Sequence, residues 1–389
     1  MNAALPSADR QPRWDIFCNV IDNFGDVGVC WRLARQLAAE HGLRVRLWVD
    51  ALESFAQICP ELDPGRSVQT VRGTEIRRWS RPFAPAEPAD VAIEAFACDL
   101  PEAYVAAMSC RAPPPVWINL EYLSAEDWVA GCHGLPSPQA LGRLTKWFYF
   151  PGFAPQTGGL VRERDLPAQR DAFQRDPAAL EAFRRAAGPG APPPGALTVS
   201  LFGYANPAAA ELLAAWEAGP EPVRCLVPEG PVVADAAAFA GSGPLAAGDR
   251  LRRGSLDLRV LPFTDQDGYD RLLWACDLNF VRGEDSFVRA QWAALPMVWQ
   301  IYPQAEDAHW PKLRAFLDRY CVGLEPGAAA ALRTFAEAWN RGAGAAAAWP
   351  AFAACLPALR RHARAWADHL GGMDDLATRL VRFCRDRVK

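Results

Sequence analysis

The chain opens with a hydrophobic pattern that switches from strand type to helix type and back again. The apolar run WDIFCNV (14–20) has the length and composition of a buried strand. Between Val29 and Glu40 the apolar residues recur at helical spacing and share one face. His41-Gly42 ends this helix, and LRVRLWVD (43–50) supplies the next strand. The pattern predicts a βαβ unit.

The same alternation continues along the chain and predicts a second α/β region. Further strand-type runs are DVAIEAFAC, PVWINLEYL and TKWFYFPGF. A new set begins at LTVSLFGY (197–204), and a helix is expected after Asn206-Pro207, a good N-cap followed by proline at the first helical position. From about Ala308 the pattern is mostly helical, and it ends in the amphipathic DDLATRLVRFCRDRVK.

These elements predict two Rossmann-like α/β domains that face each other across a central cleft. We assign residues 1–180 to the first domain, completed by a C-terminal helix over 372–389, and residues 181–371 to the second. The stretch AAGPGAPPPGA (186–196) is the clearest break in composition and is expected to be an exposed loop. Open parallel sheets bind ligands at the carboxyl ends of their strands, so we expect a ligand in the cleft.

Chain length, net charge and cysteine spacing limit the classes of protein to which this chain can belong. The 389 residues are enough for two domains of ordinary size. The formal net charge of −4 argues against nucleic-acid and anionic-membrane binding, since both need a basic face. The eleven cysteines contain no CxxC pair and are expected to be reduced. The N-terminus has no signal-peptide core and no run is long enough to span a bilayer, so we expect a cytoplasmic protein.

The loop DNFGD (22–26) carries two carboxylates at the end of the first predicted strand. Asp22 and Asp26 flank Gly25, and with Gly28 the glycine spacing is G-x-x-G, which differs from the dinucleotide-binding GxGxxG. One carboxylate can orient a substrate while the other accepts a proton. The alternative is structural: Asp26 caps the helix and Asp22 pairs with a nearby arginine. The loop alone does not separate the two interpretations.

A second loop, RGEDS (282–286), joins a predicted strand to a predicted helix. Gly283 permits the turn, and the N–H groups at the helix start suit a diphosphate. An acidic residue here can hydrogen-bond to sugar hydroxyls, and Ser286 can donate to a phosphate oxygen. A capping loop is the structural alternative, since Asp and Ser cap helices well.

Three further polar or aromatic residues follow predicted strand ends in the second domain. Tyr204 can stack on a base or cover a sugar, although a core tyrosine is an equally good interpretation. Gln266 and Tyr269 lie where a loop can contact a pyrimidine edge. The five histidines form neither HxxxH nor HxH, and the sequence has no carboxylate cluster with metal spacing, no GxSxG and no P-loop. This pattern favours chemistry without a metal.

Taken together, IFCNVIDNFGDVGVCWRLARQL and NFVRGEDSFVRAQW resemble the EarP family, the elongation factor P arginine rhamnosyltransferases. The similarity extends over nearly the whole chain, from about Trp14 into the terminal helices. It implies a GT-B glycosyltransferase fold of two facing Rossmann-like domains. It also implies transfer of L-rhamnose from dTDP-β-L-rhamnose to one arginine of bacterial elongation factor P, with inversion and without a metal or a further cofactor.

The resemblance also implies roles for individual residues. Asp22 and Asp26 match the two aspartates of the family's N-terminal loop, with Asp26 as the general base, and Glu284 matches a glutamate needed for activity. The acceptor-side loop further contains Asn23, Phe24, Gly25 and Gly28. The donor-binding residues implied by the resemblance are Tyr204, Gln266, Tyr269, Arg282, Gly283, Glu284, Asp285 and Ser286.

An arginine acceptor poses a chemical difficulty, because a protonated guanidinium is not nucleophilic. An anionic pair orients this cation but opposes its early deprotonation, so we expect proton loss to accompany attack. Two other functions are compatible with the sequence. One is a GT-B-type glycosyltransferase or sugar-nucleotide epimerase acting on a small molecule. The other is a nucleotide-sugar sensor or protein-binding module without catalysis, against which the paired aspartates argue.

Overall fold

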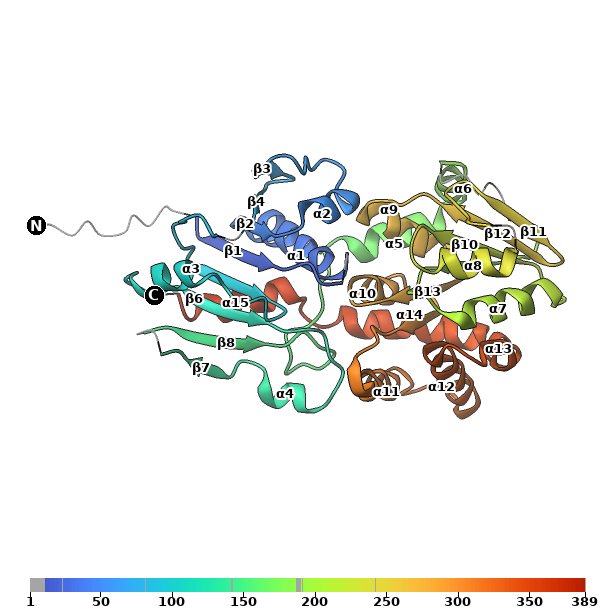
Figure 1. Ribbon diagram of the computed structural model, residues 1–389. Coiled ribbons are helices and arrows are strands. Elements are labelled where there is room, and N and C mark those ends of the chain that lie inside the picture. The colour runs from blue at the N-terminus through green and yellow to red at the C-terminus, as the bar shows by residue number, and fades with distance from the viewer. Residues whose placement is uncertain are drawn as a thin grey trace, which may run out of the picture. The chain divides into compact units, whose positions relative to one another are not determined.

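The chain forms two compact units in the computed structural model, which describes residues 11–22, 24–80, 82–140, 143–186, 190, 192–241 and 243–388. The first unit contains the residues up to Glu163 and those from Asp374 onward, and the second runs from Arg164 to Met373. In Figure 1 the red helix α15 accordingly lies among the blue and cyan elements of the first unit.

A mainly parallel sheet forms the centre of the first unit. Its described strands are β1 (Arg13–Cys18), β2 (Arg44–Val49), β3 (Val68–Val71), β4 (Thr74–Arg78), β5 (Val91–Ala95), β6 (Val116–Leu120), β7 (Pro136–Pro138) and β8 (Thr145–Tyr149). Their order is β3-β4-β2-β1-β5-β6-β8-β7, and β3 and β7 run antiparallel to their neighbours. The helices are α1 (Gly25–His41), α2 (Leu52–Ile58), α3 (Glu102–Ser109), α4 (Trp128–Cys132) and α15 (Leu376–Arg385).

The centre of this sheet fixes which loops meet. All residues of β5 and β6 are buried, as expected for strands that are covered on both faces. β5 pairs in parallel with β1 on one side and with β6 on the other. The loops that follow these three strands therefore leave the same edge of the sheet, and residues far apart in the sequence come together there.

The C-terminal helix α15 completes the first unit by packing against α1. Its buried residues lie on one face: Leu376, Ala377, Leu380, Val381 and Cys384. The Gln36 side chain of α1 donates to Asp375 Oδ1 at 3.0 Å and to the Arg162 carbonyl at 2.6 Å. The Leu376 N–H donates to the Leu160 carbonyl at 2.8 Å. Side-chain packing and main-chain bonds thus both hold the helix in place.

The second unit is built around another mainly parallel sheet. Its described strands are β9 (Leu197–Leu201), β10 (Val223–Pro228), β11 (Arg250–Arg253), β12 (Leu256–Leu261), β13 (Leu278–Arg282) and β14 (Met297–Gln300), in the order β11-β12-β10-β9-β13-β14. The helices are α5 (Leu166–Arg175), α6 (Pro177–Ala186), α7 (Pro207–Ala218), α8 (Val233–Ala240), α9 (Gln266–Ala275), α10 (Asp285–Trp292), α11 (His309–Tyr320), α12 (Pro326–Arg341), α13 (Ala345–Ala354) and α14 (Leu356–Gly371), with a short 3₁₀ turn η1 (Ala305–Asp307). β13 lies in parallel between β9 and β14, so the loops after these strands share one edge.

The structure confirms one predicted helix cap and moves two predicted boundaries. The Asn206 side chain accepts the Ala208 N–H at 3.1 Å with Pro207 at the first helical position, which confirms the predicted cap. α1 begins at Gly25 rather than at Val29, so the DNFGD loop is shorter than the pattern suggests. The first unit ends at Glu163 rather than at residue 180. α5 belongs to the second unit because the buried Arg170 donates to the Trp292 carbonyl at 2.9 Å.

The cysteines agree with the expectation of reduced thiols. All eleven cysteines lie within the described residues and are free thiols, most of them buried. Across the described parts of the chain, no helix is both long enough and apolar enough to cross a membrane.

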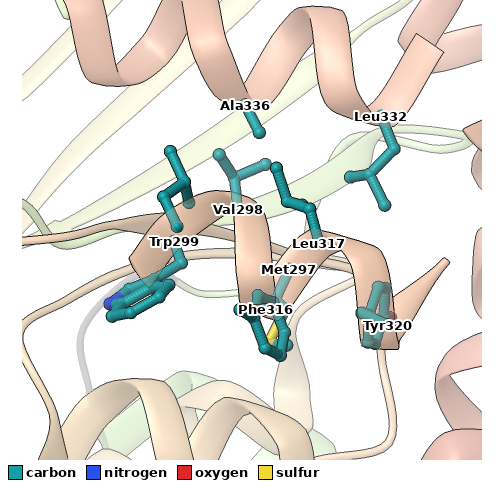
Figure 2. A pocket seen from close by; sticks show the side chains of 9 residues that line it. Met297, Val298, Trp299, Phe316, Leu317, Tyr320, Leu332 and Ala336 are labelled. Atoms are coloured by element: carbon teal, nitrogen blue, oxygen red, sulfur yellow. The ribbon is translucent and has the colours of Figure 1, made fainter. Parts of the chain in front are cut away.

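Figure 2 shows a small cavity in the core of the second unit, between β14, α11 and α12. Its volume is about 10 Å³. The lining residues are Met297, Val298, Trp299, Leu313, Phe316, Leu317, Tyr320, Leu332 and Ala336. A space at the lower limit for one water, with apolar walls, stays dry and has no room for a substrate. The cavity is a packing gap, and it lies beside Trp299, whose indole matters for the site below.

Candidate active site

Asp26 lies in the first turn of α1 and folds the preceding loop back onto the helix. Its Oδ2 accepts the main-chain N–H groups of Ile21 and Asp22, each at 2.9 Å. The residue is 3% exposed. These bonds run to residues before the helix, whose N-cap position is Phe24. The carboxylate therefore organises the loop instead of capping the helix, in contrast to the structural alternative for Asp26.

Burial governs the electrostatics of Asp26. Removal from water raises the pKa of its carboxyl above the ordinary value, and the nearby charge of Asp22 acts in the same direction. The N–H groups of Asp22 and Ile21 and the Tyr122 hydroxyl act in the opposite direction, because each donates to the ionised form. The Tyr122 hydroxyl is 3.3 Å from Asp26 Oδ1. A carboxylate with a raised pKa is the better proton acceptor, which suits a general base.

Gly25 provides space for the other aspartate. The Gly25 N–H donates to the Asp22 carbonyl at 2.6 Å, which closes the turn. A Cβ atom at Gly25 would stand 2.8 Å from Asp22 Oδ2, so any side chain there would push the carboxylate away. The Gly28 N–H donates to the Phe24 carbonyl at 2.9 Å within the start of the buried helix. Asn23 lies outside the described residues.

The RGEDS loop makes a tight turn between β13 and α10. Gly283 has a φ of 60°, in the left-handed region that glycine adopts at little cost. Its N–H donates to the Gln300 carbonyl at 3.2 Å. The Trp299 indole N–H donates to the Gly283 carbonyl at 2.8 Å, and the indole stacks on Phe287 at 3.9 Å between ring centres. The turn is thus tied both to β14 and to the helix that it introduces.

Ser286 bonds to the main chain at the end of β13. Its hydroxyl accepts the Arg282 N–H at 3.0 Å and donates to the Arg282 carbonyl. The residue is buried. The sequence suggests that this hydroxyl donates to a phosphate oxygen, and in this structure its proton is directed to the Arg282 carbonyl instead. Glu284 is the N-cap residue of α10, and Asp285 opens its first turn.

Arg282 lies against two aromatic rings that follow β9. Its guanidinium carbon is 4.8 Å from the ring centre of Phe202 and 4.5 Å from that of Tyr204. Tyr204 also makes an edge contact with Tyr302 at 5.4 Å. These contacts fix a buried cation at the carboxyl edge of the second sheet, and a cation so placed can neutralise a phosphate.

The structure brings the other predicted donor-binding residues to the same edge. Gln266 donates to Asp285 Oδ2 at 3.2 Å, which joins the start of α9 to the start of α10. The Tyr269 ring contacts Phe202 at 5.4 Å. A buried ion pair between Arg289 and Asp270, with N–O distances of 2.9 and 2.6 Å, holds the same two helices together.

The sequence pattern alone does not identify several aromatic residues near the DNFGD loop of the first unit and the RGEDS loop of the second. In the second unit they are Phe202, Trp299 and Tyr302, and in the first unit they are Phe96 and Tyr122. Phe202 and Tyr122 lie near the ends of the strand-type runs LTVSLFGY and PVWINLEYL, so their pattern is that of core residues. Aromatic side chains at strand ends are not distinguishable from core residues by pattern alone.

No group of three or more His, Cys, Asp or Glu side chains within the described ranges has the geometry to hold a metal ion.

A family model described as "Elongation-Factor P (EF-P) rhamnosyltransferase EarP" matches residues 14–385. The chain belongs to the EarP family. A relative from Pseudomonas putida, a protein-arginine rhamnosyltransferase, is 54% identical over 375 residues, which cover 96% of this chain and 99% of that protein. The family is one of glycosyltransferases that use a sugar nucleotide, and the chain is accordingly an enzyme of this class.

Solved structures agree with this family assignment. One, described as the structural basis for EarP-mediated arginine glycosylation of translation elongation factor EF-P, is 40% identical with a TM-score of 0.70, and the match covers 97% of this chain and 99% of that chain. A UDP-glucosyltransferase from Polygonum tinctorium is 9% identical with a TM-score of 0.51, covering 98% of this chain and 99% of its own. The second likeness concerns the fold alone. The two α/β units form the GT-B glycosyltransferase fold that the sequence predicts.

Proposed function

We propose that this protein transfers L-rhamnose from dTDP-β-L-rhamnose to a specific arginine of elongation factor P, with inversion and without a metal. The 54% identical relative and the 40% identical solved structure support the reaction and the acceptor. The observation that carries the mechanism is the buried Asp26, whose Oδ2 is held by two main-chain N–H groups. Because the acceptor is a translation factor, the activity belongs in the cytoplasm.

On the acceptor side, Asp26 and Asp22 bind the incoming guanidinium. Oδ2 of Asp26 is already occupied by the loop N–H groups, so Oδ1 receives an arginine N–H. Asp22 holds the cation from the other end of the loop, in the space that Gly25 leaves. Two carboxylates stabilise the protonated guanidinium, so the proton leaves only as the nitrogen begins to bond.

These groups account for each bond that forms or breaks in the transfer step and for the proton that moves. An arginine nitrogen attacks the anomeric carbon of rhamnose, and the bond from that carbon to the diphosphate oxygen breaks on the opposite face. The nitrogen's proton passes to Asp26, and the electron pair of the broken bond leaves on dTDP. Attack opposite to the leaving group inverts the configuration of the anomeric carbon.

On the donor side, Arg282 and the start of α10 stabilise the charge that develops on the diphosphate. Arg282 is pre-oriented by Phe202 and Tyr204, so its charge is in place before the bond breaks. Glu284 and Asp285 are anions and are unfavourable near phosphate, so we assign them to sugar hydroxyls. Tyr204, Gln266 and Tyr269 bind the thymidine part, and Ser286 acts chiefly by fixing the turn through Arg282.

Mass spectrometry of purified elongation factor P tests this proposal. After incubation with the protein and dTDP-β-L-rhamnose, we expect the mass of one deoxyhexose to appear on a single arginine, with an unchanged rate after EDTA treatment.

Matched controls replace that arginine by lysine or offer a small-molecule acceptor. Transfer to the small molecule alone would favour the small-molecule glycosyltransferase, and donor binding without any product would favour a sensor. A rate abolished by EDTA and restored by a divalent cation would overturn the metal-free mechanism.

A further inference from the structure

Tyr122 lies beside Asp26 although the two are far apart in the sequence. It follows β6, and Asp26 follows β1, and both strands pair with β5 in parallel. The Tyr122 hydroxyl donates to Asp26 Oδ1 at 3.3 Å, on the oxygen that the loop N–H groups leave available. This separation is long for an O–H···O bond, as catalytic hydrogen bonds often are before substrate binds.

Phe96 supports the Tyr122 ring from the neighbouring strand end. The two rings are parallel within 19°, with centres 4.5 Å apart. Phe96 is 7% exposed, and its N–H donates to the Leu120 carbonyl at 2.7 Å. Tyr122 thus rests on a buried ring that is itself bonded to the end of β6.

The segment that carries Phe96 has an unfavourable backbone conformation. Phe96, Ala97 and Asp99 have φ angles of 56°, 52° and 53°, in the left-handed region that side chains with a Cβ disfavour. Non-glycine residues keep such angles where the surrounding structure enforces them, and they gather at functional sites. Three of them within four positions place the Phe96 ring under Tyr122.

Tyr122 itself remains 41% exposed. A tyrosine with one face on Phe96 and its hydroxyl on Asp26 presents aromatic surface next to the carboxylate. A guanidinium is planar, so it can stack on an aromatic ring while it donates to a carboxylate in its own plane. A lysine ammonium has no such plane and gains less from this arrangement.

We propose that Tyr122 is a further residue of the acceptor site, whose hydroxyl orients Asp26 and whose ring is the surface on which the acceptor guanidinium stacks. The inference rests on the proposed function, since it takes an arginine as the acceptor. It assigns the preference for arginine over lysine to a ring as well as to the two aspartates. Phe96 is a positioning residue, because it acts through Tyr122.

Two substitutions separate the two tasks of Tyr122. Tyr122→Leu removes the ring, and we expect the KM for elongation factor P to rise roughly five- to thirty-fold while the KM for dTDP-β-L-rhamnose is unchanged. Tyr122→Phe keeps the ring and removes the hydroxyl. Its acceptor KM should stay within about twofold of wild type, and the acidic limb of its kcat/KM profile should move to higher pH, because Asp26 loses a donor to its ionised form.

The other titratable groups around Asp26 are unchanged in both variants. They include Asp22 in the same loop and the buried Cys18 thiol of β1, which in turn interacts with Cys30 in α1 and Asp50 after β2. A shift of the acidic limb in Tyr122→Phe therefore reports on the lost hydroxyl. A purely structural role would alter stability without moving this limb.

The control is Trp128→Leu, which removes another exposed aromatic residue of the same unit, 51% exposed and packed on Phe150. It should leave the acceptor KM and the pH profile unchanged.

Phe96→Leu keeps an apolar side chain under Tyr122 and should reproduce part of the rise in the acceptor KM even if Tyr122→Leu fails to fold. An unchanged acceptor KM in the folded ring-deletion variants, or an unshifted limb in Tyr122→Phe, overturns the proposal. Absence of transfer by the wild-type enzyme would instead contradict the proposed function.

Discussion

The main-chain N–H of Asp22 donates to Oδ2 of Asp26 at 2.9 Å. The two aspartates are therefore parts of one folded turn and have different surroundings. Asp26 is buried and is fixed by main-chain hydrogen bonds. The carboxylate of Asp22 instead lies beside Gly25, in space that a side chain at position 25 would fill. This asymmetry favours Asp26 as the proton acceptor and Asp22 as the residue that orients the substrate.

Replacing the Asp26 carboxylate by an amide should stop the chemistry while preserving the loop. In Asp26→Asn the side-chain oxygen can still accept the N–H groups of Ile21 and Asp22, but it is no longer a base. We expect kcat to fall about 10²- to 10⁴-fold. The affinity for dTDP-β-L-rhamnose, measured by calorimetry, should stay unchanged. Turnover close to wild type would exclude Asp26 as the base.

The same substitution should raise stability at neutral pH. The pKa of Asp26 is raised in the folded protein, so its protonated form favours folding and this contribution is lost as pH rises through the folded pKa. At pH 7 the buried carboxylate opposes folding, and the neutral amide of Asp26→Asn does not. We expect the variant to melt at a higher temperature than wild type at pH 7. The difference should shrink as pH falls towards 4, and a lower melting temperature at pH 7 would contradict the assignment.

Gly25→Ala should separate activity from stability. Its Cβ would meet Asp22 Oδ2 at 2.8 Å and displace the carboxylate. Alanine favours a helix over glycine by up to about 1 kcal/mol, so thermal melting should show no loss of stability. Activity on elongation factor P should drop at least about tenfold, by analogy with the loss of a substrate-positioning group. Gly42→Asn, at the left-handed cap of the same helix, is a control that should leave the rate unchanged.

Trp299→Phe should weaken donor binding by loosening the RGEDS turn. The variant keeps an aromatic ring to stack on Phe287 and loses the 2.8 Å bond to the Gly283 carbonyl. A neutral hydrogen bond contributes about 0.5–1.5 kcal/mol, so the KM for dTDP-β-L-rhamnose should rise about two- to thirteen-fold. The KM for elongation factor P should not change. Trp310→Phe is the matched control, and an equal rise there would show a general effect of losing an indole.

The central strands of both sheets could be predicted because they are continuous apolar runs between loops with recognisable turn residues. The pattern does not predict β3, β4, β7 and β11, since these strands are short and polar-rich and acquire their conformation from pairing with a neighbour. The pattern places the start of α1 at Val29, four residues too late, because Gly25 and Gly28 are poor helix formers. Their helical state depends on the tertiary burial of the first turn.

The sequence predicts the candidate site as two loops, 22–26 and 282–286, together with Tyr204, Gln266 and Tyr269, and the structure adds what these segments contact. Two carboxylates beside glycines at a strand end carry a chemical signal, and so does RGEDS. The direction of a hydroxyl carries none, so the bond of Ser286 to the Arg282 carbonyl could not be foreseen. Tyr122 and Phe96 also gave no signal, because their role depends on three parallel strands ending at one edge.

The return of the chain to its first unit has a consequence for synthesis on the ribosome. α15 leaves the ribosome only after the whole second unit, yet it packs against α1, and its N-cap residue Asp375 accepts a hydrogen bond from Gln36. Until α15 is synthesised, α1 lacks this packing partner, and the second unit is completed first. Maturation of the Asp22–Asp26 half of the enzyme is therefore a late event, timed by the emergence of a helix that carries none of its chemistry.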